Sequence, residues 1–161
     1  GPATVALAIP LYTHFRRVKA MLVPIIVGLV AGSLTAAFSA LLVARLMGAS
    51  VATQLSLAPK SVTTPIAMGI AERIGGLPSL TAVLVITTGI LGAVAGRYLF
   101  DALGVRDPAI RGFATGVTAH GIGTARAFPE SEQAGAFWAL GMGMNGLLTA
   151  VLLPVLLPLF G

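Results

Sequence analysis

PKSVTTP at residues 59–65 interrupts a hydrophobic stretch in which one continuous helix would satisfy its own backbone hydrogen bonds. HGIGTAR at residues 120–126 interrupts a second hydrophobic stretch. Both segments share a basic residue followed four positions later by threonine: Lys60 with Thr64, and His120 with Thr124. Interrupted helices at corresponding positions of two repeats are typical of transporter binding sites. The two segments therefore predict a fold with two interrupted helices and a binding site at the interruptions.

The composition around these segments is that of a membrane protein. The chain has 161 residues, of which 57% are hydrophobic and only 9% are charged, whereas soluble domains carry about a quarter charged residues. Apolar stretches of about 20 residues are long enough to cross a bilayer. We expect three such spans, at about residues 20–47, 78–102 and 133–159. The predicted fold is an all-α, polytopic membrane bundle forming a single domain over residues 1–161.

Two interrupted helical elements are expected between these spans, at about residues 50–74 and 108–128. Thr64 is expected to cap the second half of the first element, and Gly75 to end it. Asp107 is expected to cap the start of the second element, where proline follows at the first helical position. The sequence therefore predicts helix–break–helix geometry rather than a long loop.

An interrupted element followed by a span occurs twice, at residues 50–102 and 107–159, which indicates a weak internal repeat. If both interrupted elements re-enter, most Lys and Arg residues lie on one side, together with the basic segment 13–19. If both cross, this asymmetry nearly vanishes. The positive-inside rule favours re-entrant elements from opposite faces, and hence an inverted repeat with segment 13–19 in the cytoplasm. Fully crossing, unwound helices are the alternative.

The net charge of +5 does not indicate nucleic-acid binding, because the basic residues lie mostly in short connections where they set membrane orientation. The chain has no cysteine and only two histidines, far apart in sequence, so it offers no thiol chemistry and no metal-site pattern. Sequence motifs of hydrolases, metalloproteases and phosphate-binding loops are absent. We therefore predict a protein that is not an enzyme and needs no cofactor or metal.

The chemistry of the two interruptions suits a small anion. Amides at the start of a half-helix carry partial positive charge, and Lys60 adds a full one. No acidic residue occurs in 50–71 or 109–129, which argues against a sodium site and leaves His120 as the evident proton carrier. The predicted substrate-binding residues are Lys60, Ser61, Thr63, Thr64, His120, Gly121, Gly123, Thr124, Arg126 and Asn145.

Each of these residues also has a purely structural interpretation. Lys60 could extend its amine to the membrane interface, and His120 could be a hydrogen-bonded core residue. Arg126 could be a loop-end residue that sets orientation, and Asn145 could bond a neighbouring helix. The occurrence of the polar segments as a pair favours the functional interpretation. Trp138, near the start of the last span, is expected to lie in an interfacial aromatic belt.

Several motifs resemble the signature of the LrgB/CidB family. They are PKSVTTPIA at 59–67, GGLPSLTAV at 75–83, GILGAV at 89–94, AHGIGTA at 119–125 and NGL at 145–147. GPATVALA at residues 1–8 is similar to an upstream motif of the same family. The resemblance covers essentially the whole chain. Family members normally have further hydrophobic segments before this point, so the chain looks N-terminally short.

The resemblance implies two functions. Bacterial members are called antiholin-like and are linked to murein hydrolase export and autolysis with a small LrgA/CidA-like membrane partner. Plastid relatives are glycolate/glycerate translocators, and some bacterial systems are linked to pyruvate uptake. We predict a transporter of small monocarboxylates in the bacterial inner membrane, working by alternating access, with an antiholin-like regulator of lysis as the alternative. A homo-oligomer is expected, with a dimer as the default.

Overall fold

Three long helices form the frame of the protein in the computed structural model, which describes residues 8–120 and 131–156. They are α4 (Leu22–Leu46), α7 (Pro78–Ala102) and α10 (Glu132–Leu156), each of 25 residues. A helix of this length rises about 37 Å, more than the hydrocarbon core of a bilayer requires. All three are apolar enough to cross a membrane. The prediction of an all-helical membrane bundle is therefore confirmed.

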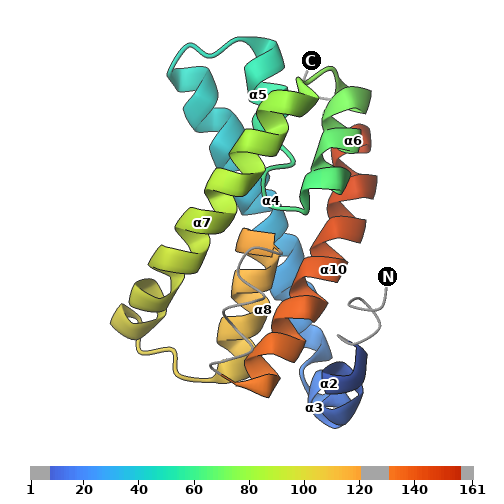
Figure 1. The fold of residues 1–161 in the computed structure, drawn as a ribbon, viewed down its shortest axis with the longest axis vertical. Helices are drawn as coiled ribbons and strands as arrows, with labels where there is room; N and C mark the ends of the chain where they lie inside the picture. The colour runs from blue at the N-terminus through green and yellow to red at the C-terminus, as the bar shows by residue number, and fades with distance from the viewer. Residues whose placement is uncertain (1–7, 121–130, 157–161) are drawn as a thin grey trace.

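The basic segment 13–19 before the first span is mostly helical, although its position between hydrophobic stretches suggests a loop. Helix α2 covers Ala8–Thr13 and α3 covers Phe15–Ala20, and Met21 separates α3 from α4. No glycine or proline occurs from residue 13 to residue 22, and Arg, Lys and Ala are good helix formers. The basic cluster therefore lies on a short helix at the end of the bundle (Figure 1).

The first interrupted element enters and leaves the bundle at the same end. Helix α5 (Val51–Leu57) follows α4, residues 58–63 descend into the bundle, and α6 (Thr64–Ile74) rises back to the end where α7 begins (Figure 1). Gly75 ends α6 in the left-handed conformation, with φ of 86°, which confirms its predicted role. Across the described residues the element is a re-entrant helical hairpin.

Helix α8 (Pro108–Ala119) starts at the opposite end and stops part of the way along the bundle (Figure 1). The Asp107 side chain caps it, accepting hydrogen bonds from the Ala109 and Ile110 amides at 2.8 and 3.4 Å, as predicted. The remainder of this element, residues 121–130, lies outside the described residues. Helix α10 then starts at the end where α8 began, which favours the re-entrant alternative for this element too.

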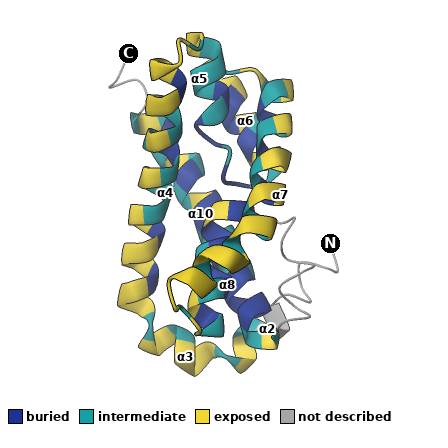
Figure 2. Cartoon of the chain, turned by 90° about the vertical axis from the view of Figure 1, so that its left-hand side faces the viewer, coloured by how far each residue is buried: buried dark blue, intermediate teal, exposed yellow. Residues whose placement is uncertain are grey.

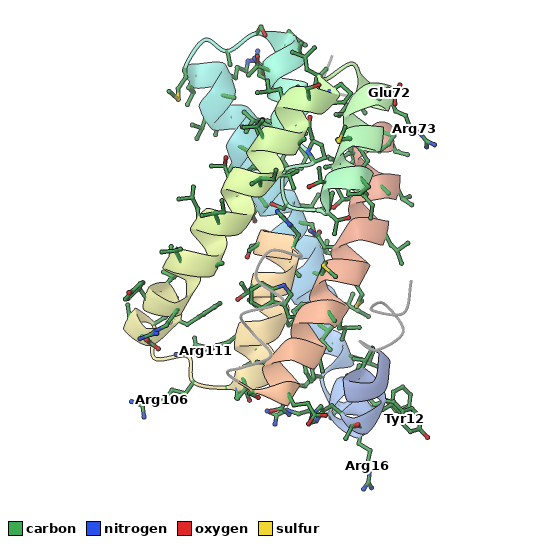
Figure 3. The ribbon with its side chains drawn as sticks, in the orientation of Figure 1. Tyr12, Arg16, Glu72, Arg73, Arg106 and Arg111 are labelled. Carbon is green, nitrogen blue, oxygen red and sulfur yellow. The ribbon has the colours of Figure 1, made fainter. Side chains whose placement is uncertain are left out.

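An ion pair joins the basic segment to the start of α8. Arg17 on α3 binds the carboxylate of Asp107, so the two segments lie at one end of the bundle. We call this the basic end. Figure 3 shows Arg16, Arg106 and Arg111 at this end and Arg73 at the other. Helix α3, which carries Arg17 and Lys19, and the last turns of α7, which carry Arg97, also lie at the basic end, whereas Arg45 is in the last turn of α4, at the other end (Figure 1). The charge asymmetry that the re-entrant alternative requires is therefore present.

The two halves run in opposite directions. The α5–α6 hairpin enters from the end away from the basic end, and α7 then runs to the basic end (Figure 1). Helix α8 enters from the basic end, and α10 then runs away from it. Each half thus combines an interrupted element with one span, in the inverted arrangement that the sequence predicts.

Helix α8 is the most enclosed of the longer elements. Seven of its twelve residues are buried, against four of the 25 in α4, and Figure 2 shows exposed residues along the outer faces of α4 and α7. One apolar cluster packs α8 against α4 and α10 through Ile25, Leu29, Phe113, Val117 and Phe137. Helix α8 therefore lies inside the bundle, and most of residues 58–62 in the first interruption are buried as well, which is where broken backbone is tolerated.

Glycines bring α8 and α10 into direct backbone contact. A Cβ atom on Gly112 or Gly116 would lie 2.2 Å from the carbonyl oxygen of Ala134 or Trp138 respectively, and one on Gly141 would lie 2.5 Å from that of Phe113. Such small-residue contacts are typical of membrane helix pairs. Helix α4 also approaches α8 at a glycine, because a Cβ atom on Gly32 would lie 3.3 Å from the Val117 side chain.

We expect Gly116→Ala to destabilise the protein by about 1–3 kcal/mol, because its methyl group would force α8 and α10 apart. Gly143→Ala is the matched control on α10, since a Cβ atom there would meet nothing within 4 Å. Thermal unfolding in detergent checks this pair. Equal midpoints for the two variants would contradict the close contact of these helices.

Candidate functional site

The first interruption is fixed to the start of α7 by Ser56. The buried Oγ atom of Ser56 accepts a hydrogen bond from the Leu77 amide at 2.7 Å. The backbone carbonyl oxygen of Ser56 accepts one from the Thr81 hydroxyl at 3.0 Å. Gly76 lies directly against this turn, because a Cβ atom there would be 3.0 Å from the Ser56 nitrogen. These contacts hold the outer part of the hairpin, so that residues 58–63 are presented to the bundle interior.

Thr63, not Thr64, is the N-cap of α6. Its backbone is extended, with φ of −63° and ψ of 146°, and its side chain makes no capping hydrogen bond. The predicted cap was therefore wrong by one residue, because proline already supplies the helical φ angle near the start and a side-chain cap is not needed there. Among the described residues this leaves the half-buried Thr63 and Thr64 hydroxyls close to free α6 amides.

Lys60 is half buried and has no acidic partner among the residues that the structure describes. Its Nζ atom donates one long hydrogen bond, of 3.4 Å, to the Oγ atom of the neighbouring Ser61. A charged amine that is partly withdrawn from water and lacks a counter-ion attracts an anion. Lys60 therefore remains the strongest candidate for binding a carboxylate.

His120 ends α8 and is almost fully buried, with 2% of its surface exposed. Its Nε2 atom lies 2.8 Å from the carbonyl oxygen of Val85 on α7. Its backbone is strained for a residue with a side chain, with φ of 39° and ψ of −141°. The hydrogen bond to Val85 gives one ring nitrogen of His120 a structural role. The strained backbone lies where α8 ends and the second interruption begins.

Trp138 is not in an interfacial belt, contrary to the prediction. It is buried on α10, with 6% of its surface exposed, and its indole nitrogen donates a hydrogen bond of 2.7 Å to the His120 carbonyl oxygen. The sequence position near the start of a span suggested the interface, but the close approach of α8 draws the ring inside. Trp138 therefore satisfies a carbonyl that the end of α8 leaves without a helical partner.

We expect Trp138→Phe to lower stability by about 1–3 kcal/mol, because the ring remains but the His120 carbonyl oxygen loses its donor. Leu147→Phe on the same helix is the control, because Leu147 is 74% exposed and makes no such bond. Thermal unfolding in detergent measures the difference. A Trp138→Phe midpoint equal to that of the parent protein would show that the bond contributes nothing.

Asn145 joins the first interruption to the last turn of α8. Its Nδ2 atom donates to the carbonyl oxygen of Ser61 at 3.0 Å and to that of Val117, in the last turn of α8, at 2.8 Å. Its Oδ1 atom accepts from the Ser33 hydroxyl at 2.5 Å and from the Thr149 hydroxyl at 3.2 Å. The side chain is 1% exposed, and both amide protons and both lone pairs are used. The described tips of the two elements therefore meet at one buried amide.

A small cavity of about 20 Å³ lies beside this amide, between α4 and α10. Ser33, Ser61, Asn145 and Thr149 supply its polar lining, and its size suits about one water molecule. The cavity therefore has a polar wall within a mostly apolar bundle, and Ser61 of the first interruption is part of that wall.

Four predicted site residues, Gly121, Gly123, Thr124 and Arg126, lie outside the described residues. The other predicted site residues are described. The Asn145 side chain donates a hydrogen bond to the Ser61 carbonyl oxygen, and Lys60, Thr63 and Thr64 lie within three residues of Ser61 in the sequence. His120 follows the turn that contains Val117, the other partner of Asn145.

Sequence reasoning missed Ser33 and Thr149, which hold the Asn145 carbonyl oxygen. Thr149 follows Asn145 by four residues and so shares its helix face, a spacing that could have identified it. Ser33 lies on α4, and nothing in the local sequence links it to Asn145. It also missed the Gly112–Gly116 pair, whose four-residue spacing is a recognisable helix-contact signal.

The arrangement offers cationic and hydroxyl groups to a ligand but no acidic cluster. Within residues 8–120 and 131–156, no group of three His, Cys, Asp or Glu side chains could hold a metal ion. Lys60, the α6 amides and the neighbouring hydroxyls are suited to neutralise and orient a small anion.

This combination of three spans and two interrupted elements that meet at mid-bundle defines a polytopic membrane protein of the broken-helix class. The sequence model of the LrgB-like family matches residues 1–159, and the chain belongs to that family. The uncharacterized protein YwbG of Bacillus subtilis is 41% identical over 97% of this chain and 69% of its own length. YxaC of the same organism is 35% identical, over 99% of this chain and 70% of its own.

Antiholin-like protein LrgB of Bacillus cereus is 31% identical, over 99% of this chain and 70% of its own length. No solved structure matches the chain significantly. The family resemblance that the sequence motifs indicated is therefore confirmed.

Proposed function

We propose that this protein transports small monocarboxylates of the glycolate, glycerate, lactate or pyruvate type across the bacterial inner membrane. One observation carries the proposal: the Asn145 amide bonds the backbone of the first interruption and that of the last turn of α8, next to a half-buried lysine that has no acidic partner within residues 8–120 and 131–156. A structural bundle does not need two interrupted elements joined at its centre, whereas a binding site built from two inverted halves does.

In this proposal Lys60 and the amides that begin α6 neutralise the substrate carboxylate. The hydroxyls of Ser61, Thr63 and Thr64 bind the 2-hydroxy or 2-oxo oxygen. The second interruption contributes His120, Thr124 and Arg126, with the Gly121 and Gly123 backbone allowing close approach. Movement of the paired elements against α4 would open the site alternately to the two sides. The basic end faces the cytoplasm under the positive-inside rule.

An antiholin-like regulator of murein hydrolase export is the second candidate, favoured by the name of the Bacillus cereus relative, antiholin-like protein LrgB. In that case oligomers and a small membrane partner of the LrgA/CidA type would carry the activity. The two candidates differ in what the centre of the bundle must do. A regulator needs no small-molecule site there, whereas a transporter does.

Substrate protection of a single thiol tests for the site. The chain contains no cysteine, so Thr63→Cys introduces a unique thiol where the native side chain makes no capping bond. We expect glycolate or pyruvate to slow its reaction with a membrane-impermeant thiosulfonate several-fold, and uncharged ethylene glycol to leave it unchanged.

Ser79→Cys, at an exposed position near the start of α7, is the control and should react equally fast with and without carboxylate. Protection at neither position, or equal protection at both, would remove the anion site from the first interruption.

A further inference from the structure

A second polar crevice lies away from the Asn145 junction, toward the basic end of the bundle. It occupies about 50 Å³ between α7, α8 and α10. Its principal lining residues are Gly92, Gly96, Arg97, Phe100, Arg111 and Trp138. Neither the interruptions nor the proposed transport chemistry uses the two arginines in this crevice.

The crevice exists because α7 and α8 touch at one level and diverge below it. A Cβ atom on Gly92 would lie 2.5 Å from the Ala119 Cβ atom, so the helices are in contact there. Toward the basic end they separate, and the connection between them crosses the gap (Figure 1). Gly96 leaves the wall of α7 open, since only Phe100 comes within 4 Å of a Cβ atom placed there.

The two guanidinium groups have different roles. Arg111 is anchored, because it binds the Asp101 carboxylate, its Nε atom donates to the Val105 carbonyl oxygen at 2.6 Å, and it lies over the Phe100 ring. Arg97 is exposed and contacts only the ring of the adjacent Tyr98 among the described residues. No acidic side chain belongs to the described lining. One guanidinium that is held by Asp101 and a second that has no acidic partner in the part of the chain the structure describes therefore line one small space.

The surface beside the crevice is apolar. Ile86, Ile90 and Val94 are 45%, 51% and 52% exposed, and their spacing puts them on one face of α7, in line with Arg97. Helices that cross a bilayer place such a face against acyl chains. Arg97 lies in the last two turns of α7, at the depth where chains give way to head groups.

From this juxtaposition we propose that the crevice binds the head-group phosphate of an anionic phospholipid, with its acyl chains along Ile86, Ile90 and Val94. Basic pockets between membrane helices at the cytoplasmic side bind anionic head groups. Arg111 provides a preorganised donor, and Arg97 closes over the phosphate as a second, bidentate one. The site is independent of the transported substrate and would exist equally in a regulator of lysis.

Native mass spectrometry of the full-length protein, released from detergent with added lipid, tests this proposal. We expect phosphatidylglycerol to bind about tenfold more tightly than phosphatidylcholine, and Arg97→Gln to remove most of that difference. Arg106→Gln is the matched control, since it removes an exposed charge at the same end but outside the crevice. Gly96→Leu fills the crevice without changing charge and should weaken phosphatidylglycerol binding as Arg97→Gln does.

Equal loss in the Arg97 and Arg106 variants would overturn the proposal, because the effect would then come from net charge alone. Undiminished binding in Gly96→Leu would place the lipid elsewhere. Displacement of phosphatidylglycerol by millimolar inorganic phosphate would identify a site for free anions instead of lipid. Elution volumes in size-exclusion chromatography that match the parent protein show that the variants are folded.

Discussion

Lys60→Gln is expected to reduce uptake of labelled glycolate or pyruvate into proteoliposomes by about 100-fold. Removing one partner of a desolvated, charge-assisted pair typically costs about 2–5 kcal/mol, and each 1.4 kcal/mol corresponds to about tenfold. The native amine has only the 3.4 Å bond to Ser61, so its loss should leave folding intact. Uptake is therefore expected to fall while the thermal midpoint of the protein stays unchanged.

Arg73→Gln is the matched control for Lys60→Gln. It removes the same charge from the same re-entrant hairpin, but at the exposed end of α6. We expect it to retain uptake within about twofold of the parent protein, because surface charges contribute little. Normal uptake by Lys60→Gln would remove this lysine from the site.

Asn145→Leu is expected to destabilise the protein by about 2–6 kcal/mol, because two buried carbonyl oxygens, of Ser61 and Val117, would lose their donor. For a chain of this size the thermal midpoint should fall by about 5–20 °C. Uptake should be lost as well, because the first interruption and the end of α8 would no longer be held together. Thermal unfolding and uptake measured on the same preparation check both effects.

Thr149→Val tests the hydrogen bonds to Oδ1 of Asn145 separately from those that its Nδ2 atom donates. It removes one donor to Oδ1 at 3.2 Å but keeps both bonds from Nδ2 to the interruptions. We expect a loss of about 1 kcal/mol or less and near-normal uptake. If Asn145→Leu were no less stable than Thr149→Val, the amide would not be what joins the two elements.

The main elements of the fold could be predicted because each has a strong local signal. The spans follow from uninterrupted apolar length, and the observed α7 has the predicted bounds of 78–102. The hairpin at 50–74 follows from its polar interruption and its terminal glycine. Charge placement indicated the direction of each element, because Lys and Arg residues are counted from sequence alone.

Two of the failed predictions depend on contacts distant in sequence. Trp138 is interior because α8 approaches its backbone at Gly116; the Gly112–Gly116 spacing indicates a helix contact but does not name the helix that is contacted. The Asn145 bonds to Ser61 and Ser33 span 84 and 112 residues, so the sequence could mark the asparagine as unusual but not name its partners. The N-cap of α6 was missed by one residue because proline made a side-chain cap unnecessary.

Uptake of labelled monocarboxylate by the full-length protein in proteoliposomes, with and without a small LrgA/CidA-like partner, tests the central claim most directly. The account predicts saturable uptake of glycolate or pyruvate, competed by lactate and glycerate but not by uncharged glycerol or a small amine. Arg73→Gln should behave like the parent protein, and Lys60→Gln like empty vesicles. Absence of uptake under every condition, from protein that is folded and correctly inserted, would contradict the transport function and favour the antiholin-like alternative.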